Sequence, residues 1–522
     1  MKRILIAFFS VLSISRAMAN DINWSFPSTP LSAANHNASD PQIAIDANGD
    51  LIGAWVENGF IMASTKHLNL NWNTSITLST ATANSPRIVS DSLGNAAAIW
   101  LQSGMVMASS KPFTGSWSSP VILSPTGAAD PTLAVSSSGD VIAAWARNGN
   151  IETSTKLFGG NWGNRIQINS SNASHPHIAI GGTGSHERAV IVWNKISNSL
   201  NAAVSSSKLV SGNWSQEVTI SDQNHNAGFA HVAVDANGNA AAVWFLYDIN
   251  SVYSNVTVQS ALNLFSKGSW NAPVTLSAPG INNPANLIAR VACDSTGNFI
   301  ALWNTSFDGK SFNIQSAVKP VGQNWTAPTD IVSSNLFALK ADLAVTSLGD
   351  ALALYMFYNG ITLNIQSTES DISGFMNNVW SVPVLVSSGI DNGFPRVAAT
   401  LTGNIINAAT LWVSFNGTNN QILASTGSKT LVSPPSDLMI SQSVNNFGSF
   451  QNFFNTLTWD ASVDPNAVGY LIYRNGLFIE QVPANVLQFV DDNQVQNGPV
   501  TYGVASVDAQ NTHSPIITVN FP

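Results

Sequence analysis

The feature that most constrains this chain is an internal repeat of about 45 to 59 residues, which returns eight times within the first 430 residues. Each copy joins a tryptophan, a Leu-Ser-like pair, a segment of the type Pro-x-Ile-Ala-Ile-Asp-x-x-Gly and a second aromatic residue. The hairpin glycines are Gly49, Gly94, Gly139, Gly184, Gly238, Gly297, Gly349 and Gly403. The aromatic residues that follow them are Trp55, Trp100, Trp145, Trp193, Trp244, Trp303, Tyr355 and Trp412. One block of this size cannot bury its own apolar face, so the copies must pack on one another.

Within a copy, apolar and polar residues alternate with period two, which predicts strands rather than helices. The Asp-x-x-Gly junction favours a tight hairpin, because aspartate caps turns and glycine adopts positive φ without strain. The first copy therefore predicts four short strands, at residues 42–46, 51–56, 60–66 and 72–79. Repetition of a four-stranded block predicts the blade of a β-propeller.

The two ends of the array complement each other. The copy that ends near Thr426 lacks a fourth strand led by tryptophan, whereas residues 24–32 form such a strand with no preceding three. Pairing the two would close the array and remove its open edges. A second tryptophan series precedes the fourth strands, at positions 24, 72, 117, 162, 214, 270, 325 and 380. We expect both tryptophan series to fill space between neighbouring units rather than to bind sugars.

The repeated segment Pro-x-Ile-Ala-Ile-Asp-x-x-Gly-Asp/Asn resembles NHL-type and related bacterial propeller repeats over about residues 22 to 430. After Ser433-Pro434-Pro435-Ser436 the repeat stops, and the remainder resembles a fibronectin type III domain. That resemblance rests on Pro435, Leu457-Thr458-Trp459, Tyr470 to Gly476 and Tyr502 to Val507, and implies that Tyr502 is a tyrosine-corner residue. The expected fold is all-β: an eight-bladed β-propeller at 20–430, a linker at 431–436 and a fibronectin type III β-sandwich at 437–522.

Residues 1–19 have the pattern of a secretory signal peptide: Lys2 and Arg3, an apolar run from Ile4 to Ile14, and the small-residue site Ala17-Met18-Ala19. We expect cleavage after Ala19 and a secreted or periplasmic bacterial protein. No later stretch reaches the roughly 18 apolar residues of a membrane span. A single cysteine, Cys293, excludes an intramolecular disulfide.

Charged residues make up only 9% of the chain, and 20 Lys+Arg against 29 Asp+Glu give a net charge of -9. This balance argues against nucleic acid as a partner, which would require a basic surface. A carbohydrate or a surface protein is the expected partner. No cofactor motif is present, so none is expected.

Enzyme chemistry is the alternative to test. The Asp-box of sialidases, Ser-x-Asp-x-Gly-x-x-Trp, matches no copy, and no carboxylate pair stands out for glycosidase chemistry. Asp46, Asn48, Asp50 and Glu57 fit part of a calcium-loop template, but Leu51 occupies the position that needs glycine, so a turn is favoured. The histidines at 175, 177, 225 and 231 could gather around a metal, although hydrogen-bonded histidines are the commoner outcome. We assign no metal ligand and no catalytic residue.

One position of the repeat, which we call the slot, gives a better candidate site. The residue at the start of the first strand is polar in all eight copies: Gln42, Arg87, Thr132, His177, His231, Arg290, Asp342 and Arg396. Propeller geometry turns a repeated slot into a ring, here around the mouth of the central channel. Three arginines and two histidines against one aspartate favour an anionic ligand. Because eight blades make a wide channel, we expect neighbouring rather than opposite slot residues to bind one ligand together.

The predicted ligand-binding residues are therefore Arg87, His177, His231, Arg290, Arg396 and Gln42. These observations predict a secreted binding or interaction protein whose ligand is a glycan or another anion. The alternative is a secreted carbohydrate-active enzyme, a glycosidase or lyase, on the same scaffold. A simpler interpretation also stays open: the slot is polar because it faces water.

Overall fold

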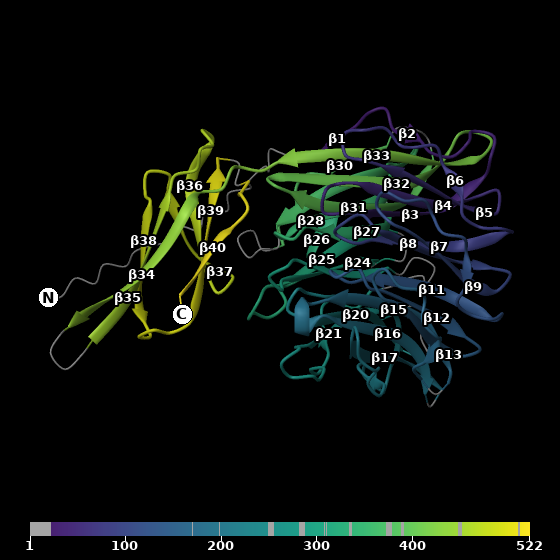
Figure 1. Ribbon diagram of the computed structural model, residues 1–522, viewed down its shortest axis with the longest axis horizontal. Helices are drawn as coiled ribbons and strands as arrows, with labels where there is room; N and C mark the ends of the chain where they lie inside the picture. Colours follow the sequence, from purple (N-terminus) through teal and green to yellow (C-terminus); the bar gives the residue numbers. More distant parts are fainter. Residues whose placement is uncertain are drawn as a thin grey trace.

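The structure, a computed structural model, describes residues 22–521 except 170, 198, 249–254, 281–287, 307, 309–310, 333–336, 372–377, 388–390, 447–450 and 510–511. The expected signal peptide at 1–19 lies outside these residues. In the described part the fold is all-β: apart from one 3-10 turn (Gly184–His186), every regular element is a strand. None of these elements is a helix long and apolar enough to cross a membrane. Figure 1 shows two lobes, a larger one from β1 to β33 and a smaller one from β34 to β40.

The larger lobe contains eight antiparallel sheets within the described residues, which we number in chain order. Sheet 1 contains β3 (Ala38–Ile45), β4 (Leu51–Glu57), β5 (Phe60–Lys66) and β6 (Ile76–Thr77). Sheet 2 contains β7 (Ala83–Ser90), β8 (Ala96–Gln102), β9 (Met105–Lys111) and β10 (Val121–Ile122). Sheet 3 contains β11 (Ala128–Val135), β12 (Val141–Arg147), β13 (Asn150–Lys156) and β14 (Ile166–Gln167). Sheet 4 contains β15 (Ala173–Gly181), β16 (Arg188–Ser197), β17 (Leu200–Leu209) and β18 (Val218–Thr219).

The remaining sheets repeat this order. Sheet 5 contains β19 (Asn226–Val234), β20 (Ala240–Tyr247), β21 (Thr257–Asn263) and β22 (Val274–Thr275). Sheet 6 contains β23 (Ala289–Cys293), β24 (Phe299–Thr305), β25 (Asn313–Lys319) and β26 (Thr329–Val332). Sheet 7 contains β27 (Phe337–Val345), β28 (Asp350–Tyr358), β29 (Leu363–Asp371) and β30 (Val384–Leu385). Sheet 8 contains β31 (Asn392–Thr402), β32 (Ile405–Phe415) and β33 (Asn420–Thr430), together with β1 (Asn23–Trp24) and β2 (Thr29–Pro30).

The sheets form a closed, propeller-like ring. The first strand of each sheet contacts the first strand of the next, and β31 of sheet 8 contacts β3 of sheet 1. The first strands are therefore innermost, and the later strands of each sheet radiate outward. The expectation of an all-β fold built from four-stranded units is confirmed.

The two ends of the ring meet in sheet 8. Trp24 lies opposite Gly427 and Thr29 opposite Ala424, so both β1 and β2 pair with β33. Figure 1 shows this junction as purple strands beside a green one. Pairing the N-terminal segment with the last sheet leaves no unpaired strand where the array begins and ends.

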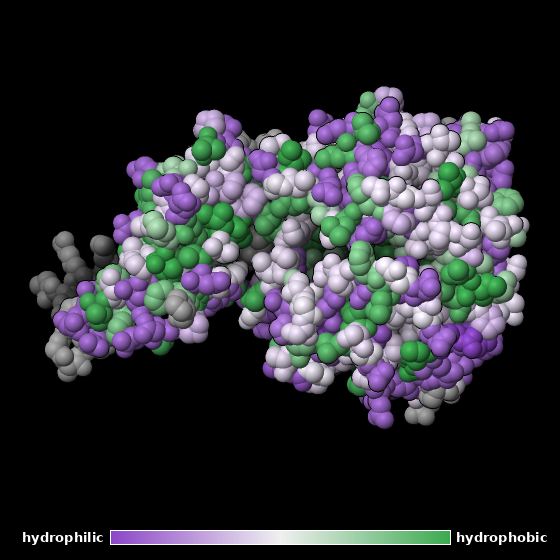
Figure 2. Space-filling view, viewed as in Figure 1, coloured by the Kyte–Doolittle hydropathy of each residue, from purple (hydrophilic) through white to green (hydrophobic). Residues whose placement is uncertain are grey.

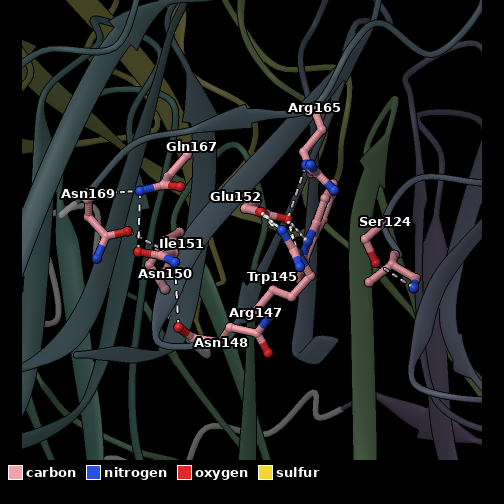
Figure 3. A network of polar contacts seen from close by, with 11 residues as sticks. Ser124, Trp145, Arg147, Asn148, Asn150, Ile151, Glu152, Arg165, Gln167 and Asn169 are labelled. Carbon is pink, nitrogen blue, oxygen red and sulfur yellow. Dashed lines mark hydrogen bonds and ion pairs between the residues drawn. The ribbon is translucent and has the colours of Figure 1, made fainter. Parts of the chain in front are cut away.

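Buried aromatic residues hold neighbouring sheets together. Trp55, Trp100, Trp145, Trp193, Trp244, Trp303, Tyr355 and Trp412 are fully buried. Figure 3 shows how one of them is satisfied: Trp145 Nε1 donates to Glu152 Oε2 over 2.9 Å, and Arg147 donates to Glu152 Oε1 over 2.8 Å. Because Glu152 is itself buried, this bonded carboxylate lets an indole N–H enter the core without an unpaired donor.

The fourth strands are shorter than the repeat pattern predicts. The strand expected at 72–79 is reduced to β6, which spans two residues. Trp72 precedes the strand and is half-buried. One edge of the outermost strand faces water and has no strand to pair with. Only the residues that lie against the third strand therefore form ladder hydrogen bonds.

The smaller lobe is a two-sheet sandwich. Its strands are β34 (Ser436–Asn446), β35 (Gln451–Asp460), β36 (Ala467–Arg474), β37 (Leu477–Pro483), β38 (Gln488–Gln494), β39 (Val500–Asp508) and β40 (Ile517–Phe521). They form a sheet in the order β34-β35-β38 and another in the order β37-β36-β39-β40. Trp459 and Tyr470 meet edge to face in the core, with ring centroids 5.4 Å apart.

Tyr502 departs from the expected tyrosine corner. Its buried hydroxyl donates to Asp491 Oδ2 over 2.5 Å, whereas a tyrosine corner bonds back to the main chain. The nearby Arg474 guanidinium also bonds Asp491, over 2.7 Å. A charged side-chain network thus replaces the main-chain acceptor.

The surface is polar but poor in charge. Figure 2 shows hydrophobic residues scattered among hydrophilic ones on the face in view. This mixture agrees with a chain in which charged residues are only 9% of the total. Scattered apolar residues of this kind are ordinary for a folded protein surface.

Candidate binding site in the central channel

A β-bulge opens the first strand of nearly every sheet at the same place. The pairing register shifts just before the slot residue in seven sheets. In those sheets the residue two before the slot has a φ between 50° and 58°, and the intervening residue is proline or alanine. Proline suits a bulge because it has no N–H to donate to the ladder. The slot residue that follows the bulge lines the cavity at the ring centre in every one of these sheets, as do Asp130, His175 and Phe229 from before the bulge.

Two sets of positions follow from the bulge. The channel positions are the slot residues Gln42, Arg87, Thr132, His177, His231, Arg290, Asp342 and Arg396. The mouth positions lie two residues earlier: Asp40, Ser85, Asp130, His175, Phe229, Ile288, Lys340 and Phe394.

All eight channel positions line a single cavity of about 510 Å³. The six residues that the sequence singles out are thus brought together. Arg87 and Arg290 come from sheets 2 and 6, across the ring, yet both act electrostatically on His177. The expectation that neighbouring members share a ligand stays a prediction. Long arginine side chains reach inward from opposite walls and narrow the channel.

The two channel histidines form a stacked pair with fixed hydrogen bonds. The ring centroids of His177 and His231 are 3.5 Å apart. Val232 N–H donates to His177 Nδ1 over 3.3 Å, and Val291 N–H donates to His231 Nδ1 over 3.4 Å. Each Nδ1 is therefore an acceptor, so the ring proton of the neutral form is carried by Nε2.

This environment keeps both rings neutral. Burial, followed by the Arg290 and Arg87 guanidinium groups, lowers the pKa of His177 to about 3. Burial and the neighbouring His177 and Arg290 likewise hold the pKa of His231 well below its ordinary value. Counting the two histidines as cations from the sequence is therefore wrong, because burial first and the neighbouring charges second disfavour the protonated form of both rings.

Asp342 lies between two arginines of the cavity. Its Oδ1 atom is 3.5 Å from Arg290 Nε and 3.9 Å from Arg396 Nη1. Its Oδ2 atom accepts the N–H of Val397, in sheet 8, over 3.1 Å. Asp342 and the two histidines thus have the same structural role, because each accepts an unpaired backbone N–H from the innermost strand of the next sheet.

Arg87 has a different environment. Its Nη1 donates to the carbonyl oxygen of Pro86 over 2.8 Å, and no carboxylate of the described residues lies within ion-pair distance. Burial and the Arg396 charge lower the pKa of Arg87 to about 10, against an opposing effect of Asp40. Its guanidinium group is the cavity cation with the least compensation.

The mouth positions were not found by sequence reasoning. Phe229 and Phe394 have positive φ and are 41% and 54% exposed. Positive φ is costly for a bulky side chain, and exposed phenylalanine adds no core packing. Lys340 Nζ lies 5.8 Å from the centre of the Phe394 ring, and His175 Nε2 lies 3.8 Å from Asp130 Oδ2. The sequence signal for the mouth positions is the residue of variable type that stands before the proline or alanine in each copy.

The metal-like patterns of the sequence have other roles in the structure. Asp46 Oδ1 accepts the N–H groups of Asn48 and Asp50, each over 2.8 Å, as a turn cap does. Glu57 lies at the far end of β4 and accepts from Trp55 Nε1. His225 pairs with Asp222, away from the channel histidines. Among the described residues, no group of three or more His, Cys, Asp or Glu is placed to hold a metal ion.

Comparison with known proteins finds structural likeness only. No family model matches the chain, and no curated protein matches it. A polysaccharide lyase of family 25, an ulvan lyase solved with a bound -[GlcA(1-4)Rha3S]- fragment, is 10% identical with a TM-score of 0.46, covering 76% of this chain and 95% of that one. The six-bladed β-propeller lectin of Aleuria aurantia is 12% identical with a TM-score of 0.34, covering 58% and 97%. The polysaccharide lyase Uly1 is 9% identical with a TM-score of 0.34, covering 62% and 85%.

Proposed function

We propose that this chain is an exported glycan-binding protein whose central cavity holds a carboxylate or sulfate group of the ligand. The observation that carries the proposal is the convergence of Arg87, Arg290 and Arg396 on one cavity of about 510 Å³. Three guanidinium groups there face two lining carboxylates, Asp130 and Asp342.

The energetics of this cluster favour an anion. Burial, and with it the Arg396 charge, lowers the pKa of both Arg87 and Arg290. Holding like charges together costs free energy, and a bound anion would relieve that cost. Charge-assisted hydrogen bonds to carboxylate or sulfate are also about twice as strong as neutral ones.

The mouth positions supply the second half of the proposed site. The exposed ring of Phe229 lines the cavity, and that of Phe394 occupies the same repeat position in sheet 8. These rings would offer apolar faces to the rest of a sugar chain where it emerges from the cavity. A ligand that is anionic at one end and has apolar ring faces beyond it matches both the channel positions and the mouth positions. Acidic oligosaccharides have this chemistry.

The hydrolase or lyase alternative receives less support from the same residues. A general base works best with a pKa near the operating pH, and His177, with a pKa of about 3, is far from it. The Nδ1 atoms of both channel histidines already accept backbone hydrogen bonds. Asp342 is engaged by Arg290 and by Val397 N–H. Binding without turnover is therefore the proposal.

We also propose the finer architecture: an eight-bladed propeller at 20–430, a linker at 431–436 and a fibronectin type III module at 437–522, exported after cleavage behind Ala19. The eight sheets and the 3+4 strand order of the sandwich support it. β33 ends at Thr430, opposite Ile405 and beside the Gly403 turn, whereas the bulge of sheet 8 lies at the other end of β31. The chain thus leaves the ring at the end opposite the mouth positions, and the module leaves the cavity open.

The test uses residues 20–522 on a glycan array, followed by calorimetry with trigalacturonate, a carboxylated probe. Arg290→Gln and Arg396→Gln should each weaken binding by about 1.5 to 3 kcal/mol, roughly 10- to 150-fold. Arg474→Gln in the sandwich, which removes the same charge far from the cavity, is the control. Equal affinity for the cavity variants and the parent would overturn the site. Unsaturated uronate products, followed by absorbance, would overturn the assignment as a non-enzyme.

A further inference from the structure

A second set of tryptophans lies at the junctions between sheets. Trp24, Trp72, Trp117, Trp162, Trp214, Trp270, Trp325 and Trp380 each precede the outermost strand of a sheet, and we call them junction tryptophans. All except Trp24 are half-buried. Trp162, for example, packs against the core cluster between sheets 2 and 3 that contains Ala108 and Trp145.

At three junctions the preceding sheet anchors the indole N–H. Trp214 Nε1 donates to Thr153 Oγ1 over 3.0 Å, Trp380 Nε1 to Ser316 Oγ over 2.8 Å, and Trp24 Nε1 to Ser367 Oγ over 2.9 Å. These three hydroxyls occupy one repeat position, directly after the residue that pairs with the central buried aromatic. The tryptophans are thereby fixed as structural wedges.

At three consecutive junctions the hydroxyl is missing. The same repeat position is Ala424 before Trp72, Ala63 before Trp117 and Ala108 before Trp162. None of these three indole nitrogens is bonded to, or shut off from solvent by, the described residues. The two remaining junctions have Ser205 and Ser260, whose buried hydroxyls do not reach the indole.

Open grooves accompany two of the alanine junctions. One, of about 800 Å³, lies between sheets 2 and 3 and is lined by Trp162, Lys156, Asn161 and the serines 110, 116, 118 and 119. The other, of about 1080 Å³, lies between sheets 8 and 1 and is lined by Trp72, Lys66 and the asparagines 69, 71 and 73. Each pairs an aromatic ring and a lysine with hydroxyl or amide groups.

We propose that these two grooves are a second class of binding site, each taking one pyranose ring of a glycan. For Trp72 and Trp162 this departs from the sequence-based expectation that tryptophan only fills space between sheets. The apolar face of the sugar would lie on the tryptophan, and a sugar oxygen would accept the free indole N–H. The serine or asparagine side chains and the lysine would bond further hydroxyl or acidic groups. Alanine at the anchoring position takes away the hydroxyl that bonds the indole N–H at Trp24, Trp214 and Trp380. These sites are separate from the central cavity and do not depend on it.

The experiment follows ¹⁵N-labelled indole resonances of residues 20–522 during titration with xylohexaose and with hexagalacturonate. The Trp72 and Trp162 signals, assigned from single Phe variants, should shift on addition of one of these probes, while the anchored Trp214 signal should not. Trp162→Ala has no indole signal of its own, so calorimetry with the same probe follows it, and the number of groove sites should fall from two to one. Ala108→Thr, which places at this position the residue that anchors Trp214, should weaken the response of the Trp162 signal several-fold without lowering the melting temperature. Thr153→Ala is the matched reverse change and should make the Trp214 signal responsive.

The cavity is tested apart from the grooves by an Arg290→Gln/Arg396→Gln variant. That variant should lose the binding of trigalacturonate that calorimetry detects at the central site, and it should keep the shifts of the Trp72 and Trp162 indole signals. Failure of both probes to shift either signal, or an unchanged number of groove sites in Trp162→Ala, would overturn the groove sites and leave the central site standing.

Discussion

Replacing Asp342 with asparagine should strengthen anion binding in the cavity. The asparagine carbonyl oxygen can still accept the N–H of Val397, which Asp342 accepts over 3.1 Å, so the link between sheets 7 and 8 is retained. The negative charge that now sits 3.5 Å from Arg290 and 3.9 Å from Arg396 is removed. A gain of affinity is a demanding outcome, because misfolding cannot produce it.

The magnitude follows from Coulomb's law. An anion bonded to both guanidinium groups would lie about 6 Å from the carboxylate that they share, and an effective dielectric constant of about 20 to 40 gives a repulsion of about 1.4 to 2.8 kcal/mol. Removing it should lower the Kd by roughly 10- to 100-fold. The gain should shrink at high salt, because the channel is open to solvent.

Calorimetry with trigalacturonate at two salt concentrations measures the effect. Asp50→Asn is the matched control: it removes the same charge at the opposite end of the inner strands, where Asn95, Asn239 and Asn298 already occupy the equivalent place. If Asp342→Asn keeps the parent melting temperature but binds no more tightly, the cavity is not an anion site.

Three further outcomes test the scaffold and its electrostatics. Trp145→Ala should destabilise the fold by about 3 to 5 kcal/mol in denaturant unfolding, because it empties a fully buried site and strips Glu152 of a donor; full stability with lost binding would contradict the structural role. Deleting residues 20–32 removes β1 and β2, including the buried Trp24, and should lower the melting temperature by several degrees in calorimetry; an unchanged curve would contradict closure by this segment. The folded-state pKa of His177, about 3, lies below the ordinary value of 6.5, so its contribution to stability is present near neutral pH and is lost as pH falls from about 6.5 to about 3. NMR should show no titration of this ring above about pH 5, and His177→Gln should make the acid loss of melting temperature shallower; a midpoint near 6.5 would refute the neutral pair.

Much of the fold could be read from the one-dimensional pattern. Eight hairpin glycines, eight paired aromatics and period-two alternation predict four-stranded units, because strand geometry and turn chemistry act over a few neighbouring residues. The channel positions could also be found this way, since a repeated slot occupies an equivalent place in every sheet. The length of the outermost strands could not, because it depends on which residues face water.

What each channel side chain does was decided only by the tertiary structure. His177 and Val232 are 55 residues apart in sequence, and the hydrogen bond between them exists because the ring places one sheet's bulge beside the next sheet's free N–H. Burial and the converging arginines keep neutral a histidine that the sequence alone counts as a cation. The same ring geometry places Asp342 between Arg290 and Arg396, and sets Phe229 at the entrance. By itself, the sequence determined which side chains face the channel, because that follows from local strand register; their charges and partners depend on contacts between sheets, which no single repeat contains.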